Sequence, residues 1–278
     1  MDIPLGCFSR PWAAFEFEET LAGIAASGFS HFGFLGLRHD QPPVKDDGSA
    51  DAEAEAASLA ALKRHGLAPA ILVSTVLLDA PREAGLARLR GLVDQAVRFN
   101  VRVILEQGHS RPENYDRYFD LMGAAAPYAA EHGITFAVKP HGGITTTGAD
   151  CLATVQRVDH PGYRLCYDPG NLLYYAGDDP VQALQILAPY VVAMCIKDEV
   201  GGQGGTVTVS PGDGDVDFPA IFRILNDHGY SGPGIVETLG AGGSRASGDA
   251  GEGQDTVAEV NREAVRAYKY LQSVLGSV

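Results

Sequence analysis

Two ionisable residues stand close together at the end of one apolar run. The stretch "ITFAVKPHGG" (residues 134–143) is apolar as far as Val138 and then offers Lys139 and His141. If the run is a buried strand, side chains two positions apart lie on the same face, so the ammonium and the imidazole point the same way. A charge on a buried face is costly unless it is paired. The stretch therefore predicts a site in which Lys139 supplies charge and His141 exchanges a proton near neutral pH.

Seven further short apolar runs also end in polar residues. In chain order these residues are Ser9, Arg10 and Trp12; Arg38 and His39; Ser74; Glu106 and His109; Asp168 and Asn171; Cys195 and Lys197; and Glu237. The three carboxylates among them can pair with the two lysines if the ends of the runs converge. The alternative is a ring of structural ion pairs that closes the top of the core.

The apolar runs alternate with alanine-rich helical stretches. Each junction falls on a residue that accepts the left-handed conformation after a helix end, namely Gly28, Gly66, Asn100, Gly133 and Gly229. The runs themselves are short and unbroken, which is typical of strands buried on both faces. This order predicts repeated helix-then-strand units.

Eight such strands fit an α/β fold that is a single (β/α)8 TIM barrel over residues 1–278. A doubly wound open sheet is the rival, but no G-x-G-x-x-G follows the first run. In a barrel, functional groups lie at the C-terminal ends of the strands, where the polar residues stand here. The glycine-rich stretches 201–205 and 240–253 each follow a strand and are expected to be loops over the barrel mouth.

The overall charge limits the kinds of partner. The chain has 278 residues with 21 basic and 35 acidic side chains, a net charge of −14. This balance disfavours nucleic acid and anionic membranes, which both need a basic surface. A small-molecule substrate is the expectation, with a homo-oligomer left open.

The cysteines and the apolar segments indicate the compartment. The four cysteines form no C-x-x-C pair and mostly lie in apolar runs, so we expect reduced thiols in the core. The first residues lack the basic and apolar segments of a signal peptide, and no apolar run reaches the ~18 residues of a membrane span. These patterns predict a cytoplasmic protein.

The strand ends, taken in order, resemble the xylose-isomerase-like sugar phosphate isomerase and epimerase family. The resemblance extends over nearly the whole chain. Its most specific parts are "HGITFAVKPHGG", "CYDPGN", "CIKD" and the segment that begins "PGDGDVDFPAIF" and ends "GYSGPGIVE". The resemblance implies a TIM barrel and a sugar or polyol substrate.

The resemblance also implies a metal site, with departures. Family members usually hold one divalent ion, often manganese, through Glu, Asp, His and Glu at the ends of strands five to eight. The corresponding residues here are Lys139, Asp168, Cys195 and Glu237. Both changes disfavour a hard cation. One hypothesis is that the ammonium of Lys139 replaces the ion, so that no cofactor is needed. The other is one divalent metal, either manganese or a zinc ion held by Cys195, His141, Asp168 and Glu237 with Lys139 turned outward.

Proton transfer next to a sugar carbonyl, through an enediolate, is the chemistry that the resemblance implies. Glu237 is then the candidate base, and His141 or Asp168 is its partner. Lys139 or Lys197 would stabilise the enediolate oxygen in place of a metal.

Four further residues are candidates for substrate binding. Glu106, His109 and Asn171 are expected to bind hydroxyls, and Trp12 to stack on an apolar sugar face.

Three other functions remain open. The same proton abstraction with a leaving group gives a lyase or dehydratase acting on a keto-sugar or polyol. A desolvated Lys139 suggests Schiff-base chemistry. Loss of two metal ligands suggests a non-catalytic sugar-binding or partner subunit. A DNA-repair endonuclease of the same superfamily is disfavoured, because the chain is acidic and lacks a histidine-rich cluster.

Overall fold

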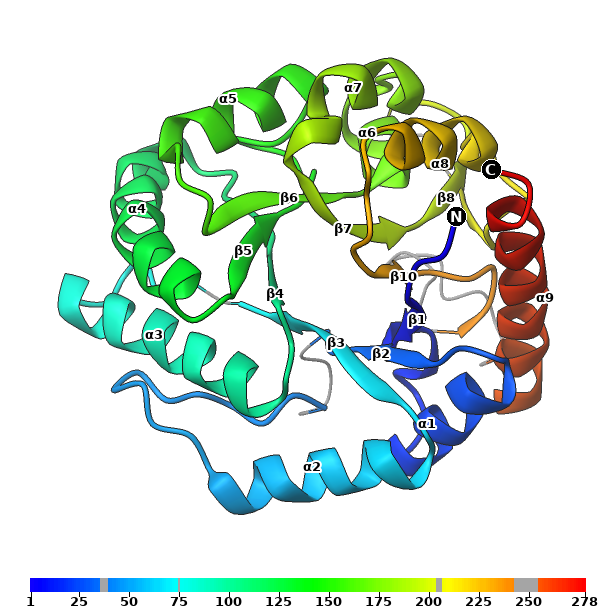
Figure 1. Cartoon of the computed structure of the whole chain (residues 1–278), viewed down its shortest axis with the longest axis horizontal. Coiled ribbons are helices and arrows are strands. Elements are labelled where there is room, and N and C mark those ends of the chain that lie inside the picture. Colours follow the sequence, from blue (N-terminus) through cyan, green and yellow to red (C-terminus); the bar gives the residue numbers. More distant parts are fainter. Residues whose placement is uncertain (36–39, 75, 204–206, 243–254) are drawn as a thin grey trace.

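The computed structural model describes residues 1–35, 40–74, 76–203, 207–242 and 255–278. Eight parallel strands close into a barrel in the order β1-β10-β7-β6-β5-β4-β3-β2 (Figure 1). The barrel strands are β1 (Leu5–Phe8), β2 (His31–Gly33), β3 (Ala68–Val73), β4 (Val103–Glu106), β5 (Thr135–Val138), β6 (Tyr163–Tyr167), β7 (Val191–Ile196) and β10 (Gly234–Val236). The predicted TIM barrel is confirmed, and the open-sheet alternative is wrong.

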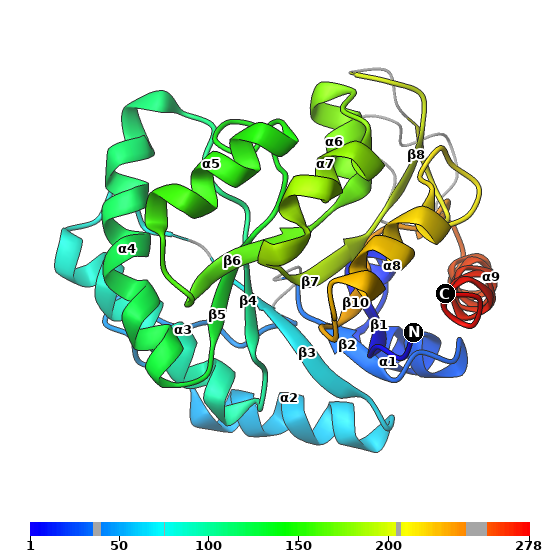
Figure 2. The ribbon, with the colours of Figure 1, turned by 45° about the horizontal axis from the view of Figure 1, so that its top comes forward.

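Helices surround the barrel in both views (Figures 1 and 2). They are α1 (Phe17–Ala26), α2 (Ala52–Arg64), α3 (Arg82–Arg98), α4 (Tyr115–Glu131), α5 (Gly148–Val158), α6 (Pro169–Ala176), α7 (Pro180–Leu187), α8 (Phe218–Asp227) and α9 (Val257–Leu275). Short 3-10 turns are η1 (Arg10–Trp12), η3 (Pro112–Asn114) and η4 (Ala188–Tyr190). Within the described ranges, no helix combines the length and the apolar character that crossing a membrane requires.

The predicted junctions between helices and strands have the expected backbone. Gly28, Gly66, Gly133 and Gly229 all have positive φ, and so does Asn100, at 54°. A residue in this conformation reverses the chain after the last helical turn and satisfies its carbonyls. These junctions return the chain from each helix to the next strand of the barrel.

Side chains alternate between two apolar layers along each strand. Leu105, Ala137 and Cys166 belong to a small cluster made only of strand residues and their neighbours, which fills the barrel interior. The adjacent Ile104 and Phe136 belong to the larger cluster shared with the helices. The residue that follows each strand therefore points inward or outward according to its place in this alternation. All four cysteines are buried and free, as the sequence predicted.

An antiparallel hairpin of β8 (Asp198–Val200) and β9 (Val207–Val209) follows β7. Asp198 fixes the segment after this hairpin, because its carboxylate accepts hydrogen bonds from the backbone N–H groups of Gly212, Gly214 and Val216 at 2.8–3.1 Å. A Cβ at position 214 would lie 2.1 Å from Asp198 Oδ1, so this approach needs glycine. The expected mouth loops fall partly outside the described residues, at 204–206 and 243–254.

Candidate active site

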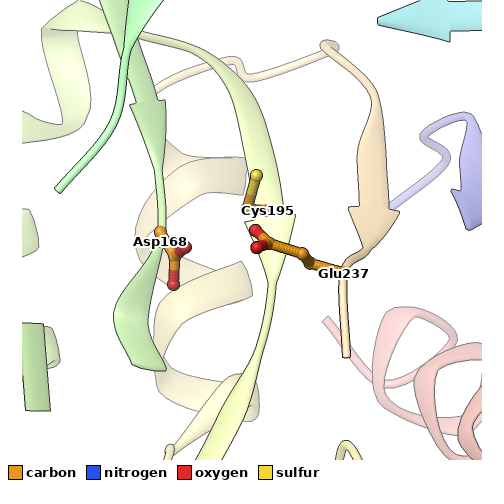
Figure 3. A group of neighbouring side chains, drawn as sticks. All are labelled: Asp168, Cys195 and Glu237. Atoms are coloured by element: carbon orange, nitrogen blue, oxygen red, sulfur yellow. The ribbon is translucent and has the colours of Figure 1, made fainter. Parts of the chain in front are cut away.

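Lys139 lies at the centre of a buried ionic cluster at the C-terminal end of the barrel. Its Nζ donates to Asp168 Oδ2 at 3.0 Å and to Glu237 Oε2. The three residues directly follow β5, β6 and β10, and the Lys139 side chain is 1% exposed. Asp168 and Glu237 point toward one another with Cys195 between them (Figure 3). The predicted convergence of the lysine with two of the carboxylates is present.

For Lys139 and Glu237, the combined attraction of opposite charges changes the pKa more than burial does. Burial alone would lower the pKa of Lys139, but the carboxylates of Glu237 and Asp168 raise it well above its ordinary value. Burial would raise the pKa of Glu237, but Lys139 and Arg10 lower it to about 2. For Asp168, burial is the larger effect and raises its pKa despite the ammonium. At neutral pH, Lys139 is an ammonium and Glu237 a carboxylate.

Arg10 completes the environment of Glu237. Its Nη1 donates to Glu237 Oε1 at 2.8 Å, so both oxygens of this carboxylate are engaged. The Arg10 side chain is 29% exposed, in contrast to the fully buried Lys139. Glu237 therefore pairs with one buried cation, Lys139, and with one cation that reaches solvent, Arg10.

The "DPGN" segment joins the cluster to a second lysine. Asp168 caps α6 by accepting from the N–H of Asn171 at 2.9 Å, and Pro169 takes the first helical position, where no N–H is needed. A Cβ on Gly170 would lie 2.8 Å from Cγ of Lys197, so glycine allows the close approach. Asn171 then accepts a hydrogen bond from Lys197 Nζ at 3.0 Å and donates to the carbonyl of Pro140.

Lys197 is held by three groups. Besides Asn171, its Nζ contacts Glu199 Oε1 at 3.0 Å and lies 5.4 Å from the centre of the Tyr174 ring. Glu199 is fully buried and also accepts from the Thr208 hydroxyl at 2.9 Å. These contacts fix the ammonium at the rim of the cluster.

His141 is half-buried and lies next to the Tyr175 ring, with 5.5 Å between ring centres. Burial, together with the positive charge of Lys139, lowers its pKa to about 4. At neutral pH the imidazole is therefore uncharged and able to accept a proton. The Thr145 hydroxyl accepts from the His141 backbone N–H at 3.1 Å, which fixes the turn that carries the ring.

The residues at the family's metal position do not fit a divalent ion as they are arranged. Ligand atoms of Asp168, Cys195 and Glu237 lie within 4.8 Å of one another, as a metal would require. However, the Lys139 ammonium already bonds to both carboxylates, and a divalent cation there would face a buried positive charge. The zinc set that includes His141 with Lys139 turned outward is not the observed arrangement, because Lys139 points inward.

Two candidate binding residues lie away from this cluster. Leu105 faces the barrel interior, so alternation turns the next residue, Glu106, toward the helices. Glu106 lines a separate cavity together with His109 and Tyr118 of α4. The prediction that Glu106 joins the other carboxylates is wrong, because the strand ends one residue out of phase with the inward positions.

Trp12 does not reach the mouth of the barrel. Its indole is fully buried, and Nε1 donates to Asn261 Oδ1 of α9 at 2.8 Å. Gly23 of α1 packs so closely that a Cβ there would lie 2.5 Å from the same nitrogen. We therefore remove Trp12 from the sugar-binding candidates.

The sequence analysis assigned no role to Arg10 and did not single out Glu199. Arg10 begins the η1 turn directly after β1, so its position at the end of the first strand was the signal that could have identified it. No sequence pattern indicated Glu199, which depends on the hairpin geometry. The strand-two candidates Arg38 and His39 lie outside the described residues.

Comparison with known proteins places these features in a family. A family profile described as "Xylose isomerase-like TIM barrel" matches residues 21–264. An inosose dehydratase from Erwinia tasmaniensis is 30% identical over 157 residues, which cover 49% of this chain and 51% of that protein. An L-ribulose-5-phosphate 3-epimerase UlaE from Escherichia coli O157:H7 is 28% identical over 169 residues, 57% of each chain. The matched segments thus span just over half the length of these two relatives.

Solved structures agree over nearly the whole length. D-psicose 3-epimerase, crystallised in the presence of D-fructose, superposes with a TM-score of 0.71 at 20% identity, covering 99% of this chain and 100% of that one. A xylose isomerase-like TIM barrel protein from Mycobacterium smegmatis, in complex with magnesium, gives 0.71 at 17% identity and 98% coverage of both chains. At these identities the structures establish the shared fold, and the profile match carries the assignment: this chain belongs to the xylose isomerase-like TIM barrel family.

Proposed function

We propose that this protein moves a proton next to the carbonyl of a sugar or polyol, using the Lys139 ammonium where relatives place a metal. One observation carries the proposal: a buried lysine bonds to two carboxylates at the family's metal position. An ammonium has three N–H donors, and the described residues use two of them. The third is available to stabilise a developing enediolate oxygen.

His141 is the proposed proton-transfer group. Its neutral imidazole accepts a proton from the carbon beside the carbonyl and returns it to the same or a neighbouring atom. Glu237, our first candidate for the base, has both oxygens engaged and a pKa lowered to about 2. We therefore assign Glu237 to holding Lys139 and Arg10, and leave Asp168 as the second carboxylate that anchors the ammonium.

Two cations border the space above the cluster. Arg10 reaches solvent, and Lys197 is held at the rim by Asn171 and Glu199. Both can donate to hydroxyl or carbonyl oxygens of a substrate, and Tyr175 offers an apolar edge beside His141. Schiff-base chemistry at Lys139 is disfavoured, because a lysine whose pKa is raised by two carboxylates is protonated and not nucleophilic.

Dehydration is the second candidate reaction. The match to inosose dehydratase favours it, and elimination begins with the same proton abstraction beside a carbonyl. Epimerisation returns the proton, whereas dehydration expels a neighbouring hydroxyl as water after that hydroxyl receives a proton. Both reactions share His141 and Lys139 in the roles above.

Proton exchange in heavy water tests both reactions at once. The purified protein, treated with a chelator, is incubated in D2O with D-psicose, D-fructose, L-ribulose 5-phosphate or an inosose, and deuterium at the carbon beside the carbonyl is followed by NMR. We expect incorporation with at least one substrate, or formation of the dehydrated product, and no dependence on added manganese.

Two variants assign the exchange to the cluster. His141→Gln should slow it at least 100-fold, whereas the matched control His228→Gln, on the other end of the barrel, should not change it. Exchange that appears only with manganese would contradict the role of Lys139. No exchange, but saturable binding of a sugar in a thermal-shift assay, would instead support a non-catalytic binding protein.

A further inference from the structure

The cavity lined by Glu106, His109 and Tyr118 lies beside the barrel mouth, outside the ring of strands. Its volume is about 290 Å³, and it is bounded by the loop after β3, the loop after β4 and the start of α4. Ser74 and Val76 form one wall, and Glu106, His109 and Tyr118 form much of the rest. None of the residues of the Lys139 cluster lines it, so a ligand here would not contact that cluster.

Glu106 presents an unsatisfied oxygen in this cavity. The side chain is 3% exposed, and Oε1 accepts from the backbone N–H of Gln107 at 3.0 Å. Oε2 is buried and makes no hydrogen bond with the described residues, and the Ser74 hydroxyl lies beside the same carboxyl group. Buried polar atoms in native proteins almost always have a partner, so the unsatisfied Oε2 of Glu106 in this cavity indicates a missing one.

The other polar groups of the cavity include both donors and a second carboxylate, that of Asp79. The side-chain amide of Asn114 contacts His109 Nε2 at 2.9 Å, and because an amide nitrogen donates, the ring proton lies on Nδ1. Arg111 adds a guanidinium at the edge of the cavity. A ligand whose hydroxyl groups both donate and accept hydrogen bonds suits this mixed lining.

Within the part of the chain that the structure describes, no cation lowers the pKa of Glu106. Burial raises its pKa to about 8, opposed by Ser74 and by the backbone N–H groups of Gln107 and Gly108. The groups packed against it from the barrel and from α4 are the hydroxyls of Tyr163 and Tyr118, which bond to each other at 2.8 Å. At neutral pH the carboxyl is therefore mostly uncharged and can donate through one oxygen.

We propose that this cavity binds a small neutral polyhydroxyl molecule, one of whose oxygens pairs with Oε2 of Glu106 and the Ser74 hydroxyl. The volume lies at the small end of the range for ligand pockets, which suits a polyol of a few carbons better than a full-length substrate. The site is independent of the proposed reaction, so either proposal can fail alone.

The test observes Glu106 itself. Protein labelled with 13C at the glutamate side-chain carboxyl is titrated from pH 6 to pH 10 with and without glycerol or erythritol as probes, and the Glu106 resonance is assigned by its loss in Glu106→Gln. Because the neutral carboxyl donates to the ligand, we expect the polyol to raise the titration midpoint. We also expect its affinity to weaken about tenfold from pH 7 to pH 9, one unit above the pKa.

Three controls separate this site from its surroundings. Glu106→Gln keeps a donor of similar shape, so it should bind the polyol with affinity that no longer depends on pH. Glu113→Gln, on the exposed η3 turn, should behave like the unmodified protein. His109→Gln removes the imidazole that lines the same cavity, and the pH dependence should persist in this variant.

Other outcomes would overturn the proposal. One is a resonance that neither polyol shifts at any pH. Another is an affinity that strengthens as Glu106 ionises, or a titration midpoint that potassium or ammonium lowers, since these would show a cation site.

Discussion

Two buried carboxylates at the mouth of this barrel have opposite surroundings. Glu237 follows β10, points inward, and pairs with Lys139 and Arg10, which lower its pKa to about 2. Glu106 ends β4, points toward the helices and has no cation beside it, so burial raises its pKa to about 8. Both are less than 5% exposed. The kind of residue and its burial are the same, and strand alternation decides which of the two meets a counter-charge.

The difference separates two kinds of polar site. The inward carboxylate belongs to an ionic cluster in which every charge has a partner, and removal of one member leaves the others uncompensated. The outward carboxylate is tolerated by staying neutral and leaves a donor in a cavity. Four predictions test this contrast, from the largest expected effect to the smallest.

Conversion of the central lysine should create a metal site where none fits now. In Lys139→Glu, three carboxylates and Cys195 surround the position of the ammonium, and we expect one Zn²⁺ per chain and a thermal stability that rises when zinc is added. The double change with Cys195→His should extend this to Mn²⁺, because imidazole suits a harder ion than thiolate. Elemental analysis after dialysis measures both. Stoichiometric metal in the unmodified protein would contradict the role of Lys139.

Loss of the Lys139 ammonium should reduce stability much more than replacement of Glu106. Lys139→Met leaves Asp168 and Glu237 buried without a cation, so we expect a loss of about 3–5 kcal/mol at pH 7 in urea unfolding. Glu106→Gln removes no ion pair and should change stability by less than about 1 kcal/mol in either direction at pH 4, where Glu106 is neutral in the folded protein and mostly neutral in the unfolded chain. Equal losses in the two variants would contradict the contrast.

The two carboxylates should give stability opposite dependences on pH. The ionised Glu237 contributes stability above the ordinary glutamate pKa, and this is lost as the pH falls through about 2. For Glu106, the folded protein keeps a proton that the unfolded chain releases from about pH 4.5, so stability falls as the pH rises toward 8, by up to about 1.4 kcal/mol per unit. Urea unfolding from pH 4 to pH 9 should show a slope that flattens in Glu106→Gln. An unchanged slope in that variant would show that Glu106 ionises normally.

Replacement of Arg10 should have the smallest effect on stability among these variants of the Lys139 cluster. Its guanidinium is partly solvated, so Arg10→Gln should cost only about 1 kcal/mol of stability and raise the pKa of Glu237 by a small amount. Carboxyl NMR of the labelled protein follows that pKa. If Arg10→Gln lost as much stability as Lys139→Met, the solvent-facing and the buried cation would stabilise the cluster equally, which would contradict the contrast.

Much of the fold could be predicted from local patterns. Glycine or asparagine after each helix and the unbroken apolar runs identified the strands and their order, because helix ends and buried strands impose these residue types locally. Lys139, Asp168 and Glu237 were predicted to converge because each directly follows a strand of one closed barrel. The family resemblance also implied that Lys139 and Cys195 stand at positions where metal ligands are expected.

Only the tertiary structure decided how these groups are paired. Glu106 and Glu237 have the same chemical type and the same position relative to a strand end, and only the phase of each strand sends one to the helices and the other to the axis. Trp12 was expected to stack on a sugar, but packing against Gly23 and Asn261 buries its indole. Glu199 entered the site through a hairpin that no local pattern predicted. Residue types set which charges are available, whereas contacts between distant segments set which of them are compensated, because a charge in a protein interior is stable only beside a partner.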